Sequence, residues 1–103
     1  MTDAEINLAI AKIEYPELII EHDGDLAVLN YPSGEVIFLD YCTSWADTGP
    51  IIERDNIDLH YEPMADGKDW HAASCGNIAE VWAETPTKAA ALCYLKMKGI
   101  DDA

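Results

Sequence analysis

Apolar residues near the start of the chain recur every three or four positions, as they do on one face of a helix. Thr2 and Glu5, just before them, have the spacing of a capping box, and Pro16 interrupts the pattern. We therefore predict a short amphipathic helix that ends before Pro16. Its apolar positions are Ile6, Ala9, Ile10 and Ile13.

The segment that follows has the apolar content and the turn residues of three short strands. The strands are predicted at Leu18–Glu21, Leu26–Tyr31 and Val36–Tyr41. They are separated by HDGD and PSGE, which contain the Asp, Gly, Pro and Ser residues of tight turns. A β-meander is the simplest arrangement of strands that are this close in sequence.

The stretch SWADTGPIIERDNI, beginning at Ser44, resembles a structural joint. Ser44 is predicted to cap a turn over Trp45–Asp47, which Gly49 ends. Pro50 is predicted to begin a new short helix, with its two isoleucines inward and its charged residues outward.

Three further strands are predicted in the second half of the chain. IDLHYE alternates in the manner of a strand, and DWHAAS and IAEVWAE flank a turn at Cys75–Asn77.

The last element is predicted to be a helix over Pro86–Lys98. Thr85 is its expected N-cap, Pro86 occupies its first position and Gly99 closes it. Lys96 and Lys98 lie in the last turn, where positive charge complements the helix dipole. One face of this helix carries Ala89, Ala90, Cys93, Tyr94 and Met97.

This order of elements predicts a single α+β domain over residues 1–103. We expect an antiparallel sheet, made of the β-meander and the later strands, with N- and C-terminal helices and a short central helix. The helices are expected to cover one face of the sheet.

The net charge of the chain favours some classes of partner over others. The chain has 20 acidic and 6 basic residues, for a net charge of −14, and the first 62 residues hold 14 of the acids and only 2 of the bases. Direct binding to nucleic acid or to an anionic membrane is therefore disfavoured, and a basic protein partner is favoured. No apolar run approaches the roughly 20 residues of a membrane helix and the N-terminus is acidic, so we expect a cytoplasmic protein.

Residue types that support catalysis or metal binding are present but lack the spacing those functions need. Neither the cysteines nor the histidines form a short-spaced pair, and no serine lies in a nucleophile motif. We expect no metal, no cofactor and no enzymatic activity, and we expect buried free thiols. The residues concerned are Cys42, Cys75 and Cys93, and His22, His60 and His71.

If the acidic half is functional, its charged residues should be exposed and lie largely on one side of the molecule. Trp45 could belong either to the core or to an interface, where tryptophan is a frequent hot spot. The candidate partner-binding residues are Glu17, Glu21, Asp23, Asp25, Trp45, Asp47, Glu53, Asp55 and Asp58.

Four pieces of the sequence together resemble a family of small phage proteins typified by NinX, from the nin region of lambdoid phages. They are TDAEINLAIA, DYCTSWADTGPIIERDNIDL, the tryptophan of DWHAAS, and ETPTKAAALCYLKMK, and they keep this order. The resemblance implies a phage origin and the host cytoplasm as location. It assigns no catalytic residue.

The leading hypothesis is a small phage-encoded protein that occupies a basic, nucleic-acid-binding surface of a host protein. A host defence complex, such as CRISPR or restriction machinery, is the expected kind of target. One alternative is a non-catalytic homodimeric phage accessory or structural protein, and another is an enzyme with weak sequence signals.

Overall fold

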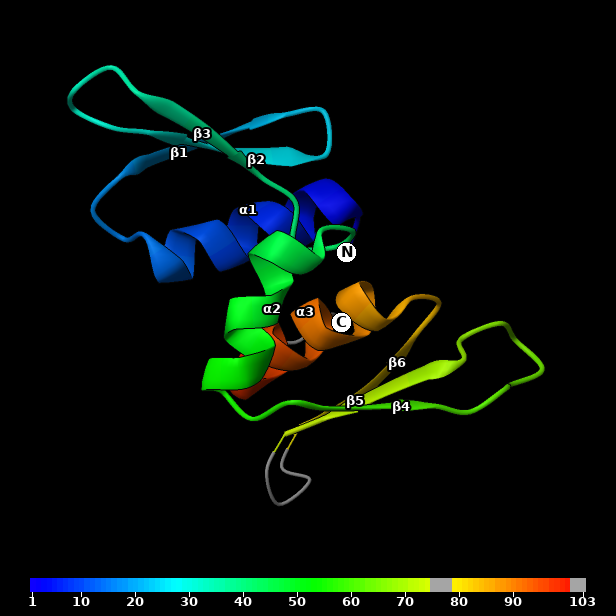
Figure 1. Cartoon of the computed structure of the whole chain (residues 1–103). Coiled ribbons are helices and arrows are strands. Elements are labelled where there is room, and N and C mark those ends of the chain that lie inside the picture. Colours follow the sequence, from blue (N-terminus) through cyan, green and yellow to red (C-terminus); the bar gives the residue numbers. More distant parts are fainter. Residues whose placement is uncertain (75–78, 101–103) are drawn as a thin grey trace.

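Within residues 1–74 and 79–100, which the computed structural model describes, the chain forms three helices and six strands (Figure 1). The predicted α+β class is confirmed, and the predicted turn at Cys75–Asn77 lies outside the described residues. The elements are α1 (Asp3–Glu14), β1 (Ile19–Asp23), β2 (Leu26–Asn30), β3 (Val36–Leu39), α2 (Trp45–Arg54), β4 (Asp58–Tyr61), β5 (Trp70–Ala73), β6 (Glu80–Ala83) and α3 (Pro86–Met97).

The strands form two separate antiparallel sheets, whereas the sequence predicted a single sheet. Sheet A has the order β1-β2-β3 and sheet B the order β4-β5-β6. Each is a meander with short connections, and Gly24, with a φ of +60°, makes the tight turn between β1 and β2. The helix α2 separates the two meanders in the chain, so neighbouring strands within each sheet pair without any long crossover.

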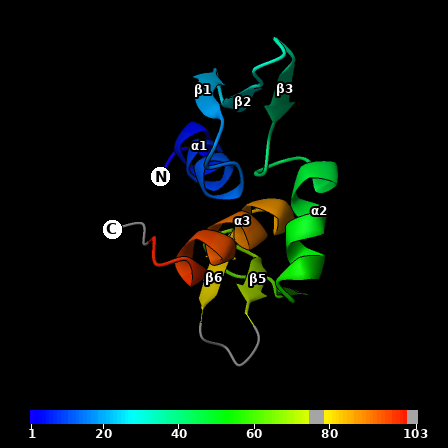
Figure 2. The same cartoon turned by 90° about the vertical axis from the view of Figure 1, so that its left-hand side faces the viewer.

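The molecule is built as four layers, in the order sheet A, α1, α3, sheet B (Figure 2). Helix α1 contacts β1 and β2, α3 contacts all three strands of sheet B, and the two helices contact each other. Helix α2 lies at the side and packs on α3. One buried apolar cluster runs through all the layers. Helices therefore cover one face of each sheet and leave both outer faces bare.

Helix α3 is buried on more sides than its sequence pattern suggested. Cys93 and Tyr94 are both fully buried, but they contact different layers. The Cys93 thiol lies 3.7 Å from the carbonyl of Ala79, beside β6, while the Tyr94 hydroxyl donates to Glu14 of α1. The predicted packing of α3 on a sheet is confirmed, with Met97 only half-buried, and the helix also forms the centre of the molecule.

A buried polar side chain, Asn7, fixes α1 against sheet A. Its Nδ2 donates to the backbone oxygen of Asp25 at 2.6 Å and to Oδ1 of Asp40 at 3.1 Å. Its Oδ1 accepts from the backbone N–H groups of Tyr41 and Cys42, at 2.7 and 3.2 Å. The Asn7 side chain therefore provides hydrogen-bond partners for backbone groups of both the β1–β2 turn and the segment after β3.

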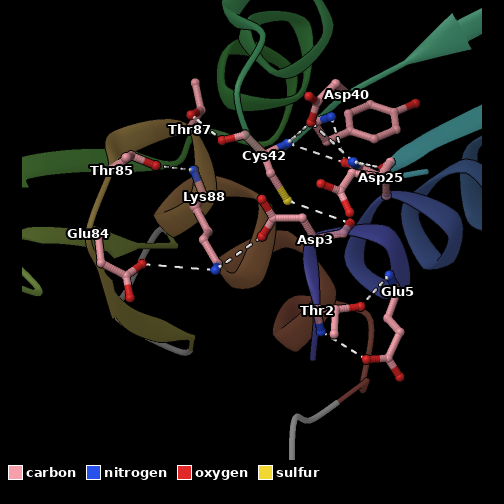
Figure 3. A network of polar contacts seen from close by, with 12 residues as sticks. Thr2, Asp3, Glu5, Asp25, Asp40, Cys42, Glu84, Thr85, Thr87 and Lys88 are labelled. Atoms are coloured by element: carbon pink, nitrogen blue, oxygen red, sulfur yellow. Dashed lines mark hydrogen bonds and ion pairs between the residues drawn. The ribbon is translucent and has the colours of Figure 1, made fainter.

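The same segment after β3 also meets the beginnings of α1 and α3 (Figure 3). The Thr87 hydroxyl donates to the Cys42 carbonyl at 2.5 Å. Lys88 Nζ lies 3.1 Å from Oδ1 of Asp3, and this hydrogen bond raises the pKa of the lysine. Thr2 and Glu5 make the predicted capping box.

Helix α2 is one continuous helix, so the predicted end at Gly49 and new start at Pro50 were wrong. Ser44 is the N-cap, as predicted, and its side chain accepts from the backbone N–H of Asp47. Gly49 has no positive φ and Pro50 lies inside the helix. The fully buried Thr48 donates its hydroxyl to the carbonyl of Tyr41, which holds the helix through the Gly-Pro pair.

Candidate interaction surface

No other described element covers the outer face of sheet A. Residues opposite each other in an antiparallel pair share a face, and Val28 is opposite both Glu21 and Phe38. The alternate β2 residues Ala27 and Leu29 are buried in the core. The outer face therefore comprises Ile19, Glu21, Asp23, Leu26, Val28, Asn30, Val36 and Phe38.

Large apolar side chains are exposed on this outer face. Ile19, Val36 and Phe38 are 71, 44 and 52% exposed. Val28, at the centre, is only 8% exposed although no helix or strand lies over it. Val28 lies opposite Phe38, and Val36 lies two residues before Phe38 on the same face, so these three apolar side chains are neighbours. The hydrogen-bonded pair of Glu21 and Asn30 lies between them and Ile19.

The outer face of sheet B provides a comparison, because it has the polar character usual for a solvated sheet. His60, His71 and Trp82 lie opposite one another across the three strands. The Nε2 atom of His71 is 2.9 Å from Oε1 of Glu80, and its ring centroid is 4.6 Å from that of Trp82. The two sheets occupy equivalent outer layers, so the apolar character of sheet A is not a requirement of the architecture.

Acidic residues border the apolar surface. Asn30 Nδ2 donates to Oε1 of Glu21 at 2.9 Å and to the carbonyl of Ile19 at 3.2 Å, which holds the Glu21 side chain across the face. Residues 13–53, which include all of sheet A, contain no lysine and no arginine. Their acidic residues are Glu14, Glu17, Glu21, Asp23, Asp25, Glu35, Asp40, Asp47 and Glu53.

Comparison with known proteins identifies the family. Residues 1–98 match the family described as "Bacteriophage P22, NinX". This chain belongs to the NinX family. The resemblance seen in the sequence is thereby confirmed, and no curated protein matches the chain.

A solved structure shares the fold of this NinX-family chain. It is described as the 2.0 Å crystal structure of a phage protein from Bacillus cereus ATCC 14579. The TM-score is 0.72 at 17% sequence identity, and the match covers 100% of this chain and 93% of the other. At this identity the likeness establishes the fold alone.

The structure spreads the predicted binding residues of the NinX-family chain over three regions. Glu17, Glu21, Asp23 and Asp25 are exposed in or beside sheet A. Asp58 is exposed on β4, in sheet B at the opposite end of the molecule (Figure 2). The predicted residues therefore do not all share one side.

Trp45 and Glu53 are exposed on α2. Trp45 is 55% exposed, so it lies outside the core, as one of the two interpretations left open for it requires. It lines a shallow surface groove together with Gly49, Pro50 and Glu53.

Two predicted binding residues, Asp47 and Asp55, are half-buried and make contacts within the chain. Asp47 accepts a hydrogen bond from the backbone N–H of Asp40 at 2.9 Å. Asp55 accepts from the guanidinium of Arg54 at 3.1 and 3.2 Å. Both carboxylates have structural partners, which makes them poorer probes of partner binding than the exposed acids on sheet A.

Sequence reasoning missed the apolar part of the surface. Val36, Ile37 and Phe38 are consecutive apolar residues in a strand, and this pattern is typical of strands buried on both faces. The sequence did contain a signal, because a strand with no alternation of polar residues exposes an apolar face when its sheet is covered on one side only. That sheet A is covered on one side only could not be predicted from the pattern itself.

The described residues offer little for catalysis. Burial raises the pKa of the Cys42 thiol to about 12 and that of the Cys93 thiol to about 11, so both thiols are protonated at neutral pH. Within residues 1–74 and 79–100, no three His, Cys, Asp or Glu side chains are arranged to hold a metal ion. No helix there is long and apolar enough to cross a membrane. The absence of a metal, of a cofactor and of enzymatic activity stays a prediction.

Proposed function

We propose that this phage protein is a non-catalytic binding protein that uses the outer face of sheet A to hold a basic surface of a host protein. The observation that carries the proposal is the group of apolar side chains on this face, left bare in a segment without lysine or arginine. The group comprises the neighbours Val28, Val36 and Phe38, and the exposed Ile19 at the edge of the face. An apolar centre with a charged border is the usual anatomy of a protein interface.

The two parts of the surface have different roles in this proposal. The acidic residues attract a basic partner over long distances and raise the association rate. The apolar side chains slow dissociation, since burying a residue such as Phe38 or Ile19 contributes about 1 to 3 kcal/mol.

A nucleic-acid-binding host protein is the partner class that fits best, because such proteins gather lysine and arginine on one surface. Occupation of that surface would exclude the nucleic acid. Host complexes that defend the cell against phage nucleic acid, such as CRISPR or restriction machinery, are the members of this class that a phage gains most by blocking. The homodimeric alternative is less favoured, because it would bring two segments of the same negative charge together.

Affinity capture from host lysate tests the proposal when it compares three forms of the protein. The forms are the unchanged chain, Phe38→Ser on the outer face of sheet A, and Tyr61→Ser as a control on sheet B, where Tyr61 is also 54% exposed. We expect a basic protein to be captured by the first and third forms, to be lost with Phe38→Ser, and to be released by 0.5 M salt. Equal capture by Phe38→Ser and the unchanged chain would exclude this surface.

A further inference from the structure

One of the two edges of sheet A is formed by β3, which pairs only with β2 among the described strands. In an antiparallel pair, alternate residues direct their N–H and C=O groups at the partner strand. Tyr31 N–H donates to the Glu35 carbonyl at 3.0 Å, which fixes the alternation. Ile37 and Leu39 therefore bond to β2, and the backbone groups of residues 36 and 38 point away from the sheet.

One end of this edge is already closed by the protein itself. The backbone N–H of Asp40 continues the outward-pointing series and is bonded to the Asp47 carboxylate at 2.9 Å. Val36 and Phe38 are thus the open part of the edge. Natural proteins protect such edges with lysine, proline or a covering element, and Val36–Leu39 contains neither residue type.

The side chains at this edge favour a particular kind of added strand. Val36 and Phe38 present apolar groups on the outer face, next to where a further strand would lie. Glu35 is exposed just before β3, Asp40 follows β3 directly, and the Asp47 carboxylate of α2 is held beside Asp40 by its backbone N–H. A segment with apolar residues over the middle and lysine or arginine at both ends would match this order of charges.

We propose that the partner supplies an extended segment that pairs with β3 as a fourth strand of sheet A, with apolar side chains over Val36 and Phe38 and basic residues at its ends. This inference rests on the proposed function and specifies how the surface is used. Main-chain hydrogen bonds give affinity in such strand addition, and alternate side chains give specificity. A second copy that paired through its own sheet A does not fit, because residues 13–53 carry no basic residue to meet Glu35 and Asp40.

Amide hydrogen exchange on the full chain tests the proposal with a defined probe. The probe is the blocked peptide acetyl-Lys-Val-Thr-Val-Thr-Val-Lys-amide, and the control is the same peptide with an N-methyl group on every backbone nitrogen between the two lysines, which blocks both edges of the strand. We expect the exchange of the Val36 and Phe38 amides to slow at least about tenfold with saturating probe and to be unchanged by the control peptide. The Ile37 and Leu39 amides, which already bond to β2, should change little.

A matched pair of variants distinguishes the contribution of the Val36 backbone N–H to probe binding from that of its side chain. Val36→Pro removes the outward N–H at the first residue of an edge strand, where proline is tolerated, and Val36→Ala keeps it. We expect the probe to protect the Phe38 amide in Val36→Ala and to protect it at least about fivefold less in Val36→Pro. Equal protection in both variants would overturn strand pairing.

The remaining outcomes distinguish this inference from the proposed function. Probe binding that shifts the outer-face signals without slowing exchange at Val36 and Phe38 overturns strand addition and leaves the binding surface in place. No response to the probe overturns strand addition, while the capture experiment with Phe38→Ser decides the surface independently. Protection of both amides in the free chain that increases with its concentration would identify a second copy as the occupant and overturn the proposal.

Discussion

Single polar side chains in the core determine how the secondary structures are held together. Asn7 is fully buried and bonds to the β1–β2 turn and to the segment after β3. Thr48 and Thr87 are also buried and donate to carbonyls of that same segment. The segment between β3 and α2 therefore has its backbone satisfied by side chains from all three helices, in place of a regular hydrogen-bonding ladder.

Asn7→Ala should destabilise the protein by about 3 kcal/mol, because it takes the Asn7 partner from the buried backbone N–H of Tyr41 and also removes the hydrogen bonds to the Asp25 carbonyl and the Cys42 N–H. Urea unfolding followed by tryptophan fluorescence measures this change. Asn30→Ala is the control, since Asn30 makes two hydrogen bonds at an exposed site and should cost under about 1 kcal/mol. A loss for Asn7→Ala as small as that of the control would show that the buried network contributes little.

Residues whose signals are local could be predicted from the sequence, and residues with distant partners could not. The capping box of Thr2 and Glu5 and the cap at Thr85 involve neighbours three residues apart, and both are present. Asn7 gave no signal, because a polar residue on an apolar helix face indicates a role only when its partners are known. Those partners lie 18 or more positions away in the chain.

At the scale of elements, one carboxylate joins the three helices. Glu14, at the end of α1, accepts from Arg54 of α2 at 2.8 and 3.0 Å and from the hydroxyl of Tyr94 on α3. The hydrogen bond from Arg54 lowers the pKa of Glu14 below its ordinary value of 4.5, against the opposing effect of burial. The ionised form of Glu14 is thus favoured by folding.

A carboxylate whose pKa is lowered by folding stabilises the protein fully above its ordinary pKa and less as the pH falls through the folded value. Glu14→Gln should therefore be less stable than the unchanged chain by about 2 kcal/mol at pH 7. The difference between the two should shrink as the pH falls below about 4.5. Urea unfolding of both forms from pH 7 to pH 3 measures it, and a constant difference over this range would contradict the link.

The elements themselves were largely predictable, because strand and helix boundaries follow local turn and capping residues. The exception is α2, where Gly49 and Pro50 favour a break in isolation. Tertiary contacts override that preference: Ser44 caps the helix, and Thr48 and Ile51 are buried on its inner side. The residue pattern alone does not predict these tertiary contacts.

At the scale of the whole molecule, the two sheets could not be separated from the sequence. Six strands with short connections fit one sheet as well as two, and the choice depends on α3, which is buried between α1 and sheet B. The division determines the interaction surface, because it leaves sheet A with an outer face of its own and puts Asp58 at the other end of the molecule. The chain extends 45 Å along its long axis, so the two ends are well separated compared with the Debye length of about 8 Å.

The most direct test of the binding surface compares two double charge reversals that change the net charge equally. Glu21→Lys with Asp23→Lys alters the outer face of sheet A, and Asp58→Lys with Glu62→Lys alters exposed positions in and beside sheet B. Each pair should change the free energy of unfolding by no more than about 1 kcal/mol per residue, because these charges are exposed.

The decisive measurement is the association rate of each double variant with the captured basic partner at low ionic strength. We expect charge reversal on sheet A to slow association at least about tenfold, and charge reversal at the sheet B end to have a much smaller effect. Equal slowing of association by the two pairs would show that only the net charge acts. Greater slowing by the sheet B pair would place the partner at the other end of the molecule. Either result would contradict the outer face of sheet A as the binding surface.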